Sequence, residues 1–319
     1  MREKLGRPSK RVVQNPGDGM AVVRPSQGNL VLYNAAYVEG VHFDLLYTSA
    51  AEVGHRCLAL ALNHLVARGV CPRQASLGVG LCQDHGEVFV SELCSGASML
   101  AKQVPLDLIA EHNFASPSFL VITISLLAEP YPKAKLIPAN SIRTGDLLAV
   151  TGFPGSSAAG LTLLRRMGRG EADNFPEVRD AHVKPMPKTK AGKALAVSGI
   201  ANSCIPLHQG LARDLHSWAE AAQCGILLDQ KSIPVSPAIE RVASFLGSDL
   251  SAWQLYGGED TELLFSVSPK KVSTLTFPFQ IVGEYRPKRE RVRIHTLNGE
   301  VVPLLPMVWT DYARRARGA

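Results

Sequence analysis

Short apolar segments alternate with amphipathic helical segments along the chain, and this alternation constrains the fold more than any other feature of the sequence. The clearest helical segment covers residues 50–69, and its apolar side chains recur at helical spacing up to a glycine stop: Val53, Cys57, Leu60, Ala61, Leu65 and then Gly69. An apolar strand is expected at 75–81, a second amphipathic helix at 87–101 and a β-rich strand at 119–128. Strands that alternate with helices pack as layered α/β or α+β domains.

The pattern is interrupted after residue 128 and then starts again. The segment Glu129-Pro130-Tyr131-Pro132 breaks it, so we place a domain boundary near residue 135 and expect domains 1–135 and 136–319. The second half opens with an expected strand at 147–151, a turn and a helix at 156–167, and 168–190 is expected to be rich in loops. Further helices are expected near 190–198, 211–223 and 237–246, and further strands at 225–229, 263–267 and 279–282. A chain of 319 residues is long enough for two cores.

Composition excludes several classes of protein. The chain is 46% hydrophobic and 19% charged, which is typical of a globular protein and not of a disordered or fibrous one. No run approaches the roughly 18 consecutive apolar residues of a membrane-spanning helix. The segment 1–11 is basic and polar with no apolar stretch behind it, so we expect a cytoplasmic protein without a secretory signal or a membrane contact. The six cysteines form no C-x-x-C pair, which favours reduced, buried thiols over disulfides or a zinc site.

The formal net charge is +6, and the excess gathers at both ends of the chain and at 286–293. A basic excess suits nucleic acid, a phosphorylated ligand or an acidic partner. No aromatic residues are interleaved with these clusters and no nucleic-acid recognition module is visible, so we expect no nucleic-acid partner and favour a solvated basic surface.

Five separated motifs occur in one order along the chain: VEGVHF at 38–43, TGFPGSSAAGL at 151–161, HVKP at 182–185, GGEDTEL at 257–263 and WTDY at 309–312. Together they resemble the thiamine-monophosphate kinase family, which belongs to the superfamily of aminoimidazole ribonucleotide synthetase. The resemblance covers nearly the whole chain. It implies a two-domain synthetase-like fold, with a mixed N-terminal sheet plus helices and a C-terminal α/β sandwich. It also implies a homodimer built through the N-terminal sheets.

The family transfers the γ-phosphoryl group of ATP to thiamine monophosphate, so the resemblance implies ATP and Mg²⁺ as cofactors. Such a transfer depends on positioning and charge neutralisation, and magnesium prefers hard oxygen ligands. The resemblance also implies residues on the side of the thiamine phosphate: His42, Glu259 and the C-terminal aromatic residue Tyr312.

Most positions where the family carries aspartates hold other residues in this chain. The early Gly-Asp-Asp of the family corresponds to Gly17-Asp18-Gly19, and its aspartate before the VEGVHF strand corresponds to Ala35. The remaining family aspartates align with His64, His112, Pro206 and Gln209. Alanine, glycine, proline and neutral imidazole supply neither charge nor good magnesium ligands. We therefore expect the kinase activity to be lost or strongly reduced.

Some candidate groups remain for phosphate or metal. The turn and helix start at Gly155 and Ser156 can present amide N–H groups to a phosphate, and Asp18 belongs to the same expected phosphate side. Asp18 and Asp260 are the candidate metal ligands. The alternative is structural: the turn joins a strand to a helix, and the adjacent acids of the GGED motif serve a helix N-terminus or solvent.

Histidines offer another possibility for the altered cleft. His64, His112 and His208 occupy or adjoin former aspartate positions, and imidazoles suit zinc, nickel or copper. The alternative is a polar cleft that has drifted to neutral residues.

Three functions therefore stay open. In the first, the chain is a slow kinase that uses Asp18, Glu259 and Asp260 around one magnesium. Alternatively, it is a non-catalytic subunit that binds a small phosphorylated ligand or pairs with itself or an intact paralogue. A third possibility is an enzyme with a new substrate in the same cleft.

Overall fold

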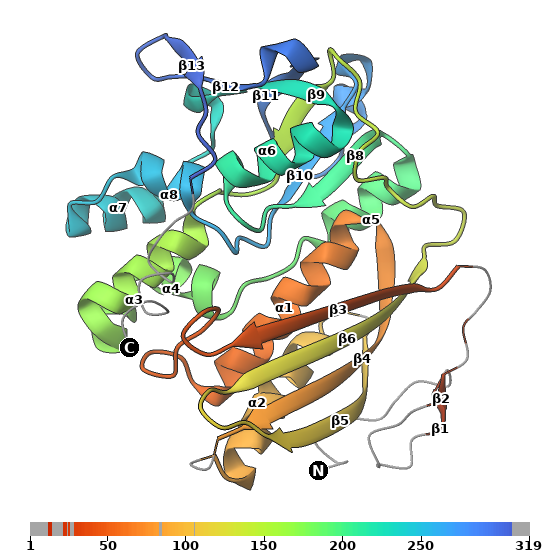
Figure 1. The fold of residues 1–319 in the computed structure, drawn as a ribbon, viewed down its shortest axis with the longest axis vertical. Coiled ribbons are helices and arrows are strands. Elements are labelled where there is room, and N and C mark those ends of the chain that lie inside the picture. The colour runs from red at the N-terminus through yellow and green to blue at the C-terminus, as the bar shows by residue number, and fades with distance from the viewer. Residues whose placement is uncertain are drawn as a thin grey trace.

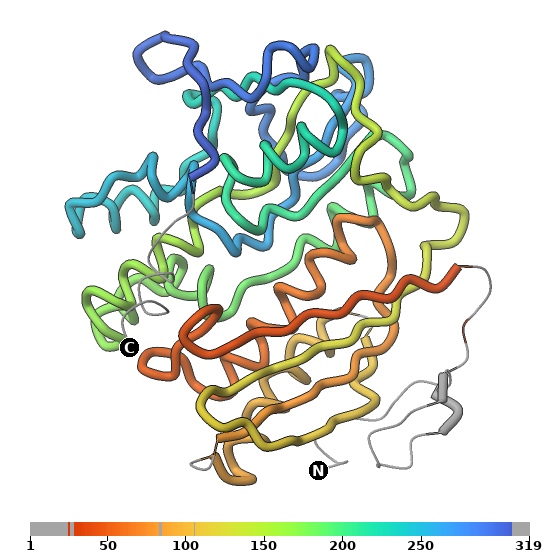
Figure 2. The backbone as a smooth tube through the Cα atoms, in the orientation of Figure 1, coloured from red at the N-terminus to blue at the C-terminus, as the bar shows by residue number. Residues whose placement is uncertain are grey.

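The computed structural model describes residues 12–14, 22–23, 25, 29–82, 85–104 and 106–307. Figure 1 shows a large sheet in each half of the chain, with helices packed between and around them, and Figure 2 shows the path of the backbone in the same orientation. Asp18, Gly19 and Tyr312 lie outside the described residues. Within the described ranges, none of the helices combines the length and the apolar character that crossing a membrane requires.

The first half is built on a four-stranded sheet with the strand order β3-β6-β4-β5. Its strands are β3 (Val31–Val38), β4 (Val70–Leu81), β5 (Asp107–Ala115) and β6 (Val121–Pro130). Strands β4 and β5 run parallel and the other neighbours antiparallel, so the sheet is mixed. Helices α1 (Ala50–Ala67) and α2 (Glu87–Ala101) cover one face and lie behind the sheet in Figure 1. Two short strands, β1 (Val12–Gln14) and β2 (Val22–Val23), pair with each other separately.

Glycines allow α1 and α2 to pack backbone against backbone. A Cβ atom added at Gly96 would lie 1.7 Å from the carbonyl oxygen of Ala51, and one added at Gly54 would lie 2.0 Å from the carbonyl oxygen of Leu93. No side chain fits into either contact. This pair of glycines therefore sets the distance between the two helices.

The second half is built on a seven-stranded sheet with the strand order β13-β12-β9-β11-β7-β10-β8. Its strands are β7 (Leu147–Val150), β8 (Ala201–Pro206), β9 (Cys224–Asp229), β10 (Leu263–Val267), β11 (Gln280–Pro287), β12 (Val292–His295) and β13 (Val301–Pro303). Its helices are α3 (Ser156–Ala172), α4 (Pro176–Val183), α5 (Thr189–Ser198), α6 (Leu211–Ala222), α7 (Pro237–Leu246) and α8 (Leu250–Tyr256). Its described residues also form the 3-10 turns η2 (Gln230–Ser232), η3 (Pro269–Thr274) and η4 (Lys288–Glu290).

Helix α1 lies between the two halves. All its residues are buried except Ala51 and His64, because one side packs on the first sheet and the other on the second half of the chain. The side-chain amide of Asn63 donates to the carbonyl oxygen of Glu262 at 3.1 Å, and His55 Nε2 lies 3.0 Å from the carbonyl oxygen of Pro185. The polar side chains of this enclosed helix therefore find their partners on the second half of the chain.

Each of the helices predicted from periodicity is confirmed, and α1, α2, α5, α6 and α7 lie close to their expected bounds. The expectation that 168–190 is rich in loops was wrong, because α3 continues to Ala172 beyond a kink at Gly168 (φ 75°) and α4 follows it. Strands β5, β8, β12 and β13 and helix α8 were not predicted. The boundary near residue 135 falls in the segment 131–146, which contains no helix or strand and joins the two sheets.

All six cysteines are free thiols, as the sequence predicted. Five are buried and Cys82 is half-buried.

Candidate ligand-binding site

A pocket of about 280 Å³ opens between the two halves of the chain. The first half contributes the 41–42 loop, and the second half contributes the start of α3, the end of α4, the loop before α6 and the GGED turn. The lining residues are Val41, His42, Ser157, Ala158, Leu161, His182, His208, Gln209, Arg213, Tyr256, Gly258 and Glu259. His42 and Glu259, which the sequence placed on the substrate side, therefore line one pocket.

Arg56 of α1 holds three walls of this pocket together. Its side chain is fully buried. Nε donates to the carbonyl oxygen of His42 at 3.1 Å, and the two terminal nitrogens donate to the carbonyl oxygen of His182 and to the carboxylate of Glu259. A buried charge is tolerated when it is paired and its donors are satisfied. Arg56 meets this condition, and its contacts fix the position of Glu259.

The ring of His42 is oriented by its own strand. Its Nδ1 accepts the backbone N–H of Val38 at 3.0 Å, so the neutral ring carries its proton on Nε2. The ring meets Tyr37 edge to face, with 5.4 Å between the centroids. A short loop thus presents one imidazole edge to the pocket in a defined tautomer.

Glu259 occupies a strained turn. Its φ angle of 62° lies in the left-handed region, which is unfavourable for a residue with a side chain. Its backbone N–H donates to the carbonyl oxygen of His208 at 2.7 Å, and a Cβ atom added at Gly258 would lie 2.6 Å from that same oxygen. The glycine allows the turn to approach the loop before α6 closely enough to hold Glu259 in place.

The start of α3 is bound by an aspartate of the GGED turn. Asp260 is buried, and its two oxygens accept the backbone N–H groups of Gly155 at 2.8 Å and Ser157 at 2.9 Å. Burial raises the pKa of Asp260 to about 7. The Ser156 hydroxyl donates to the carbonyl oxygen of Phe153 at 2.5 Å. The structure thus brings Gly155, Ser156 and Asp260 together, with the carboxylate directed to the helix N-terminus.

Behind this helix start, Ser157 and His182 form a buried pair with 3.0 Å between Oγ and Nδ1. Burial lowers the pKa of His182, and the nearby guanidinium of Arg56 lowers it further. His182 is therefore neutral at pH 7.

Two of the histidines at or beside former aspartate positions lie together. The rings of His64 and His208 are 5.2 Å apart, and His64 stacks on Tyr33 of β3 with 4.7 Å between centroids. Burial lowers the pKa of each imidazole to about 4. Ala35 packs its methyl group against the core beside this stack. Both imidazoles are thus uncharged at neutral pH.

The other replaced positions lie elsewhere. His112 is exposed on β5, at the opposite edge of the sheet from β3, and so apart from the pair of His64 and His208. Pro206 ends β8, and Gln209 is exposed at the pocket with its backbone N–H bound to Asp214. Among the described residues, no group of three or more His, Cys, Asp or Glu side chains is arranged to hold a metal ion.

The residues that align with the family aspartates do not fit magnesium and ATP. A triphosphate with its metal ions needs carboxylate oxygens around it, and the described residues there are an alanine, a proline, an amide and neutral imidazoles. Asp260, a candidate ligand, already has both oxygens bound to backbone N–H groups.

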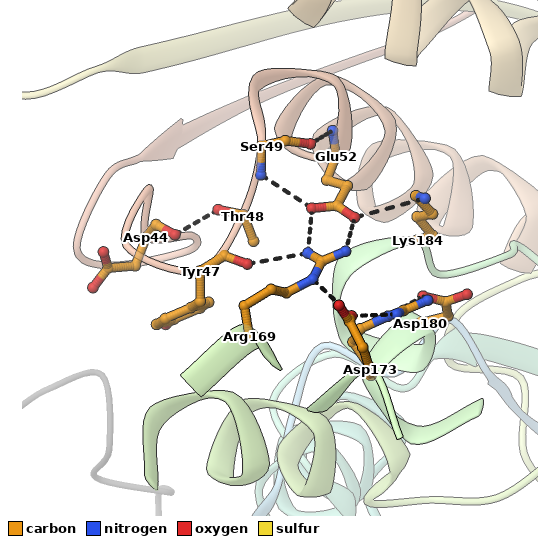
Figure 3. Close-up of polar contacts among 10 residues, drawn as sticks. Asp44, Tyr47, Thr48, Ser49, Glu52, Arg169, Asp173, Asp180 and Lys184 are labelled. Atoms are coloured by element: carbon orange, nitrogen blue, oxygen red, sulfur yellow. Dashed lines mark hydrogen bonds and ion pairs between the residues drawn. The ribbon is translucent and has the colours of Figure 1, made fainter. Parts of the chain in front are cut away.

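A second polar cluster fixes the two halves next to the pocket (Figure 3). Both oxygens of Glu52 on α1 bind the Arg169 guanidinium, at 2.7 and 2.8 Å, and Arg169 also donates to the carbonyl oxygen of Tyr47 and to Asp173. Burial alone would raise the pKa of Glu52, but the hydrogen bonds from Arg169 and Ser49 hold it below its usual value. Arg169 directly follows the kink at Gly168, and its side chain reaches Glu52 of α1 (Figure 3).

The sequence did not single out Arg56, Arg213 or Tyr256 as pocket residues. A signal was present for Arg56, because its charge lies beside the apolar positions Val53, Cys57 and Leu60 of a helix that is expected to be buried. Arg213 and Tyr256 carry no such signal, since only the fold brings α6 and α8 to the pocket.

Comparisons with known proteins agree with this architecture. The family model for AIR synthase related protein, N-terminal domain, matches residues 17–126. The thiamine-monophosphate kinase of Escherichia coli O157:H7 is 30% identical over 277 residues, which cover 84% of this chain and 82% of that protein. The enzyme of the same name from Bacillus subtilis is 28% identical over 263 residues, covering 79% and 78% of the two chains.

Solved structures share the fold. The crystal structure of thiamine-monophosphate kinase from Stenotrophomonas maltophilia K279a superposes with a TM-score of 0.80 at 23% identity, covering 94% of this chain and 95% of that one. The structure of AaThiL complexed with AMPPCP and TMP gives a TM-score of 0.77 at 24% identity, covering 92% and 90%. Identity and coverage over most of both chains, together with the shared fold, show that this protein belongs to the thiamine-monophosphate kinase family.

Proposed function

We propose that this family member binds a small phosphorylated ligand of the thiamine monophosphate type in the pocket of His42 and Glu259, and that transfer of the γ-phosphoryl group from ATP is lost or strongly reduced. The replacement of the family aspartates by Ala35, His64 and the other neutral residues carries this proposal. Because each ~1.4 kcal/mol of lost transition-state stabilisation slows a reaction tenfold, several missing ligands are enough to abolish a measurable rate.

The pocket supports retained ligand binding. Its shape is fixed by the buried Arg56, its wall presents the oriented ring of His42, and the guanidinium of Arg213 is available at the rim for a phosphate. These features do not depend on magnesium. A relative's structure holds TMP together with an ATP analogue, which makes thiamine monophosphate the first ligand to test.

Calorimetry with thiamine monophosphate and, separately, with ATP and magnesium tests the proposal. We expect thiamine monophosphate to bind without magnesium, and His42→Ala to weaken it at least tenfold. His295→Ala, on β12 and outside the pocket lining, is the matched control and should leave the affinity unchanged. Tight magnesium-dependent binding of ATP, or ADP release with thiamine monophosphate at rates typical of kinases, would overturn the proposed loss of activity.

A second candidate function is that of a partner subunit, and the face of the four-stranded sheet that none of the described helices covers favours it. In Figure 1 the described helices that pack on this sheet lie on its far side. On the near face, Leu32 is 61% exposed and Phe114 is 39% exposed, beside the small residues Gly78 and Gly80. An exposed apolar sheet face of this kind suits a second copy of the chain or a related protein.

A further inference from the structure

A groove of about 820 Å³ runs along α6, next to the ligand pocket. One side is α6 and the other is the turn between β11 and β12. The lining residues are Arg213, His216, Ser217, Ala219, Glu220, Gln223, Cys224, Lys288, Arg291, Val292 and Pro306. The basic segment 286–293, which the sequence marked as a charge cluster, forms part of this wall.

The charges in the groove are mostly positive. The charged residues that line it are one acid, Glu220, and three basic residues, Arg213, Lys288 and Arg291. Within the described part of the chain, the guanidinium groups of Arg213 and Arg291 form no ion pair, and both side chains are exposed. Two unpaired arginines in a concave surface leave donors available for an anion.

The turn that carries Arg291 is strained and rigid. Its φ angle of 58° lies in the left-handed region, which costs on the order of 1 kcal/mol for a residue with a side chain. Two backbone bonds hold it: Arg291 N–H donates to the Lys288 carbonyl at 3.0 Å, and the Ile226 N–H donates to the Arg291 carbonyl at 2.9 Å. A Cβ atom added at Gly225 would lie 2.9 Å from that carbonyl oxygen, so glycine allows the approach.

Lys288 is also positioned, at the same end of the groove. Its ammonium donates to the side-chain oxygen of Gln223, the residue that ends α6 with a φ angle of 54°. Lys288 and Arg291 are thus fixed at one end of α6, while Arg213 lies ten residues before Gln223, about 15 Å along the helix. Arg213 also lines the ligand pocket, so the pocket and the groove meet at this residue.

We infer that this groove binds the phosphate chain of a small phosphorylated molecule directly through arginine and lysine, without a metal ion. Arginine forks and a lysine ammonium match phosphate oxygens. No Phe, Tyr or Trp among the described residues lines the groove, so it offers no platform for stacking nucleobases, and a single-stranded nucleic acid is disfavoured. Lys288 and Arg291 line the groove and not the His42 pocket, so binding at their end of the groove does not require thiamine monophosphate in the pocket.

The test uses the full chain, inorganic tripolyphosphate as the probe and EDTA to remove divalent ions. We expect calorimetry to show binding that weakens with added salt and that falls at least tenfold in Lys288→Gln. Arg291→Gly is the sharper variant, because it removes the guanidinium and also relieves the left-handed strain. It should lose at least tenfold in affinity while its melting temperature stays the same or rises. Arg241→Gln, an exposed arginine on α7 outside the groove lining, should change the affinity less than twofold.

Three results would overturn the inference. The first is that tripolyphosphate does not bind in EDTA. The second is that it binds Arg291→Gly and Lys288→Gln as tightly as the wild type. The third is that an oligonucleotide of matched charge binds at least tenfold more tightly than tripolyphosphate through the same two residues. The last result would assign the groove to nucleic acid.

Discussion

Arg56 shows how one side chain of the first half shapes a pocket made mostly by the second half. It is fully buried and joins the His42 loop, the end of α4 and the GGED turn. Removing one partner of a buried ion pair leaves the other charge unpaired, which is more costly than losing a surface pair.

Arg56→Leu should therefore lower the free energy of unfolding by about 3–5 kcal/mol, since it leaves the Glu259 carboxylate and two carbonyl groups without their donor. Arg286→Leu, which removes the half-exposed partner of Glu284, should cost less than about 1 kcal/mol. Urea denaturation measures both. Similar losses for the two variants would show that the Arg56 contacts do not hold the pocket together.

The pair of His64 and His208 should give the protein a pH dependence that a single substitution reveals. The pKa of each imidazole is lowered to about 4 in the folded chain, so the unfolded chain takes up these protons first as the pH falls. Their stabilising contribution is complete at neutral pH and is lost as the pH falls from about 6.5 to 4. Asp214 and Asp260, whose pKa values are raised to about 7 by burial, oppose this trend.

Between pH 7 and pH 5, the free energy of unfolding of His208→Asn should therefore fall by about 1–2 kcal/mol less than that of the wild type. Tyr33→Phe keeps the stacked ring and should retain the wild-type profile. Denaturation curves at the two pH values measure the free energy of unfolding of the wild type and both variants. Parallel profiles for His208→Asn and the wild type would mean that the imidazole is not held neutral by burial.

At the scale of elements, the N-terminus of α3 separates two interpretations of the GGED motif. The sequence offered Asp260 as a metal ligand or as a group serving a helix N-terminus. The structure directs both oxygens to the N–H groups of Gly155 and Ser157. A carboxylate there interacts favourably with the helix dipole as well as with the amides.

If Asp260 caps this helix, Asp260→Ala should lower the free energy of unfolding by about 1–3 kcal/mol in the absence of any metal, because two buried N–H groups lose their acceptor. Asp260→Asn keeps one acceptor oxygen and should lose less. Thermal unfolding in EDTA measures this. An unchanged Asp260→Ala protein in EDTA would favour the interpretation as a metal ligand.

Periodicity was enough to predict the helices because an amphipathic or buried helix repeats its pattern over several turns, as in 50–69. Strands β5 and β12 were missed since they are polar or basic at many positions and are strands only by pairing with neighbours. The same distinction holds in the site. His42 and Glu259 lie within recognisable motifs, whereas Arg213 and Tyr256 reach the pocket only through tertiary packing.

At the scale of the whole molecule, the resemblance implied a homodimer through the N-terminal sheets, and this remains a prediction. We propose the exposed face of β3, β6, β4 and β5 as its interface. Leu32, on the edge strand β3, is among its most exposed apolar residues. Pairing of this face in two copies would remove apolar surface from water, at about 25 cal/mol per Å².

Leu32→Glu should therefore shift the protein from dimer to monomer in light scattering coupled to size exclusion, because it places a charge in the proposed interface. Val197→Glu, at a 58% exposed position on α5, should leave the mass unchanged. A wild-type protein that elutes as a monomer at micromolar concentration would contradict the proposed dimer.

The enclosure of α1 on both sides bears on how such a chain can be divided. A gene cut near codon 135 would yield a fragment whose central helix has lost half of its surroundings, including the partners of Arg56, Asn63 and Glu52. Neither fragment is expected to fold on its own. Co-expression of both fragments should give folded protein, whereas separate expression should not. The two halves are therefore expected to fold as one unit.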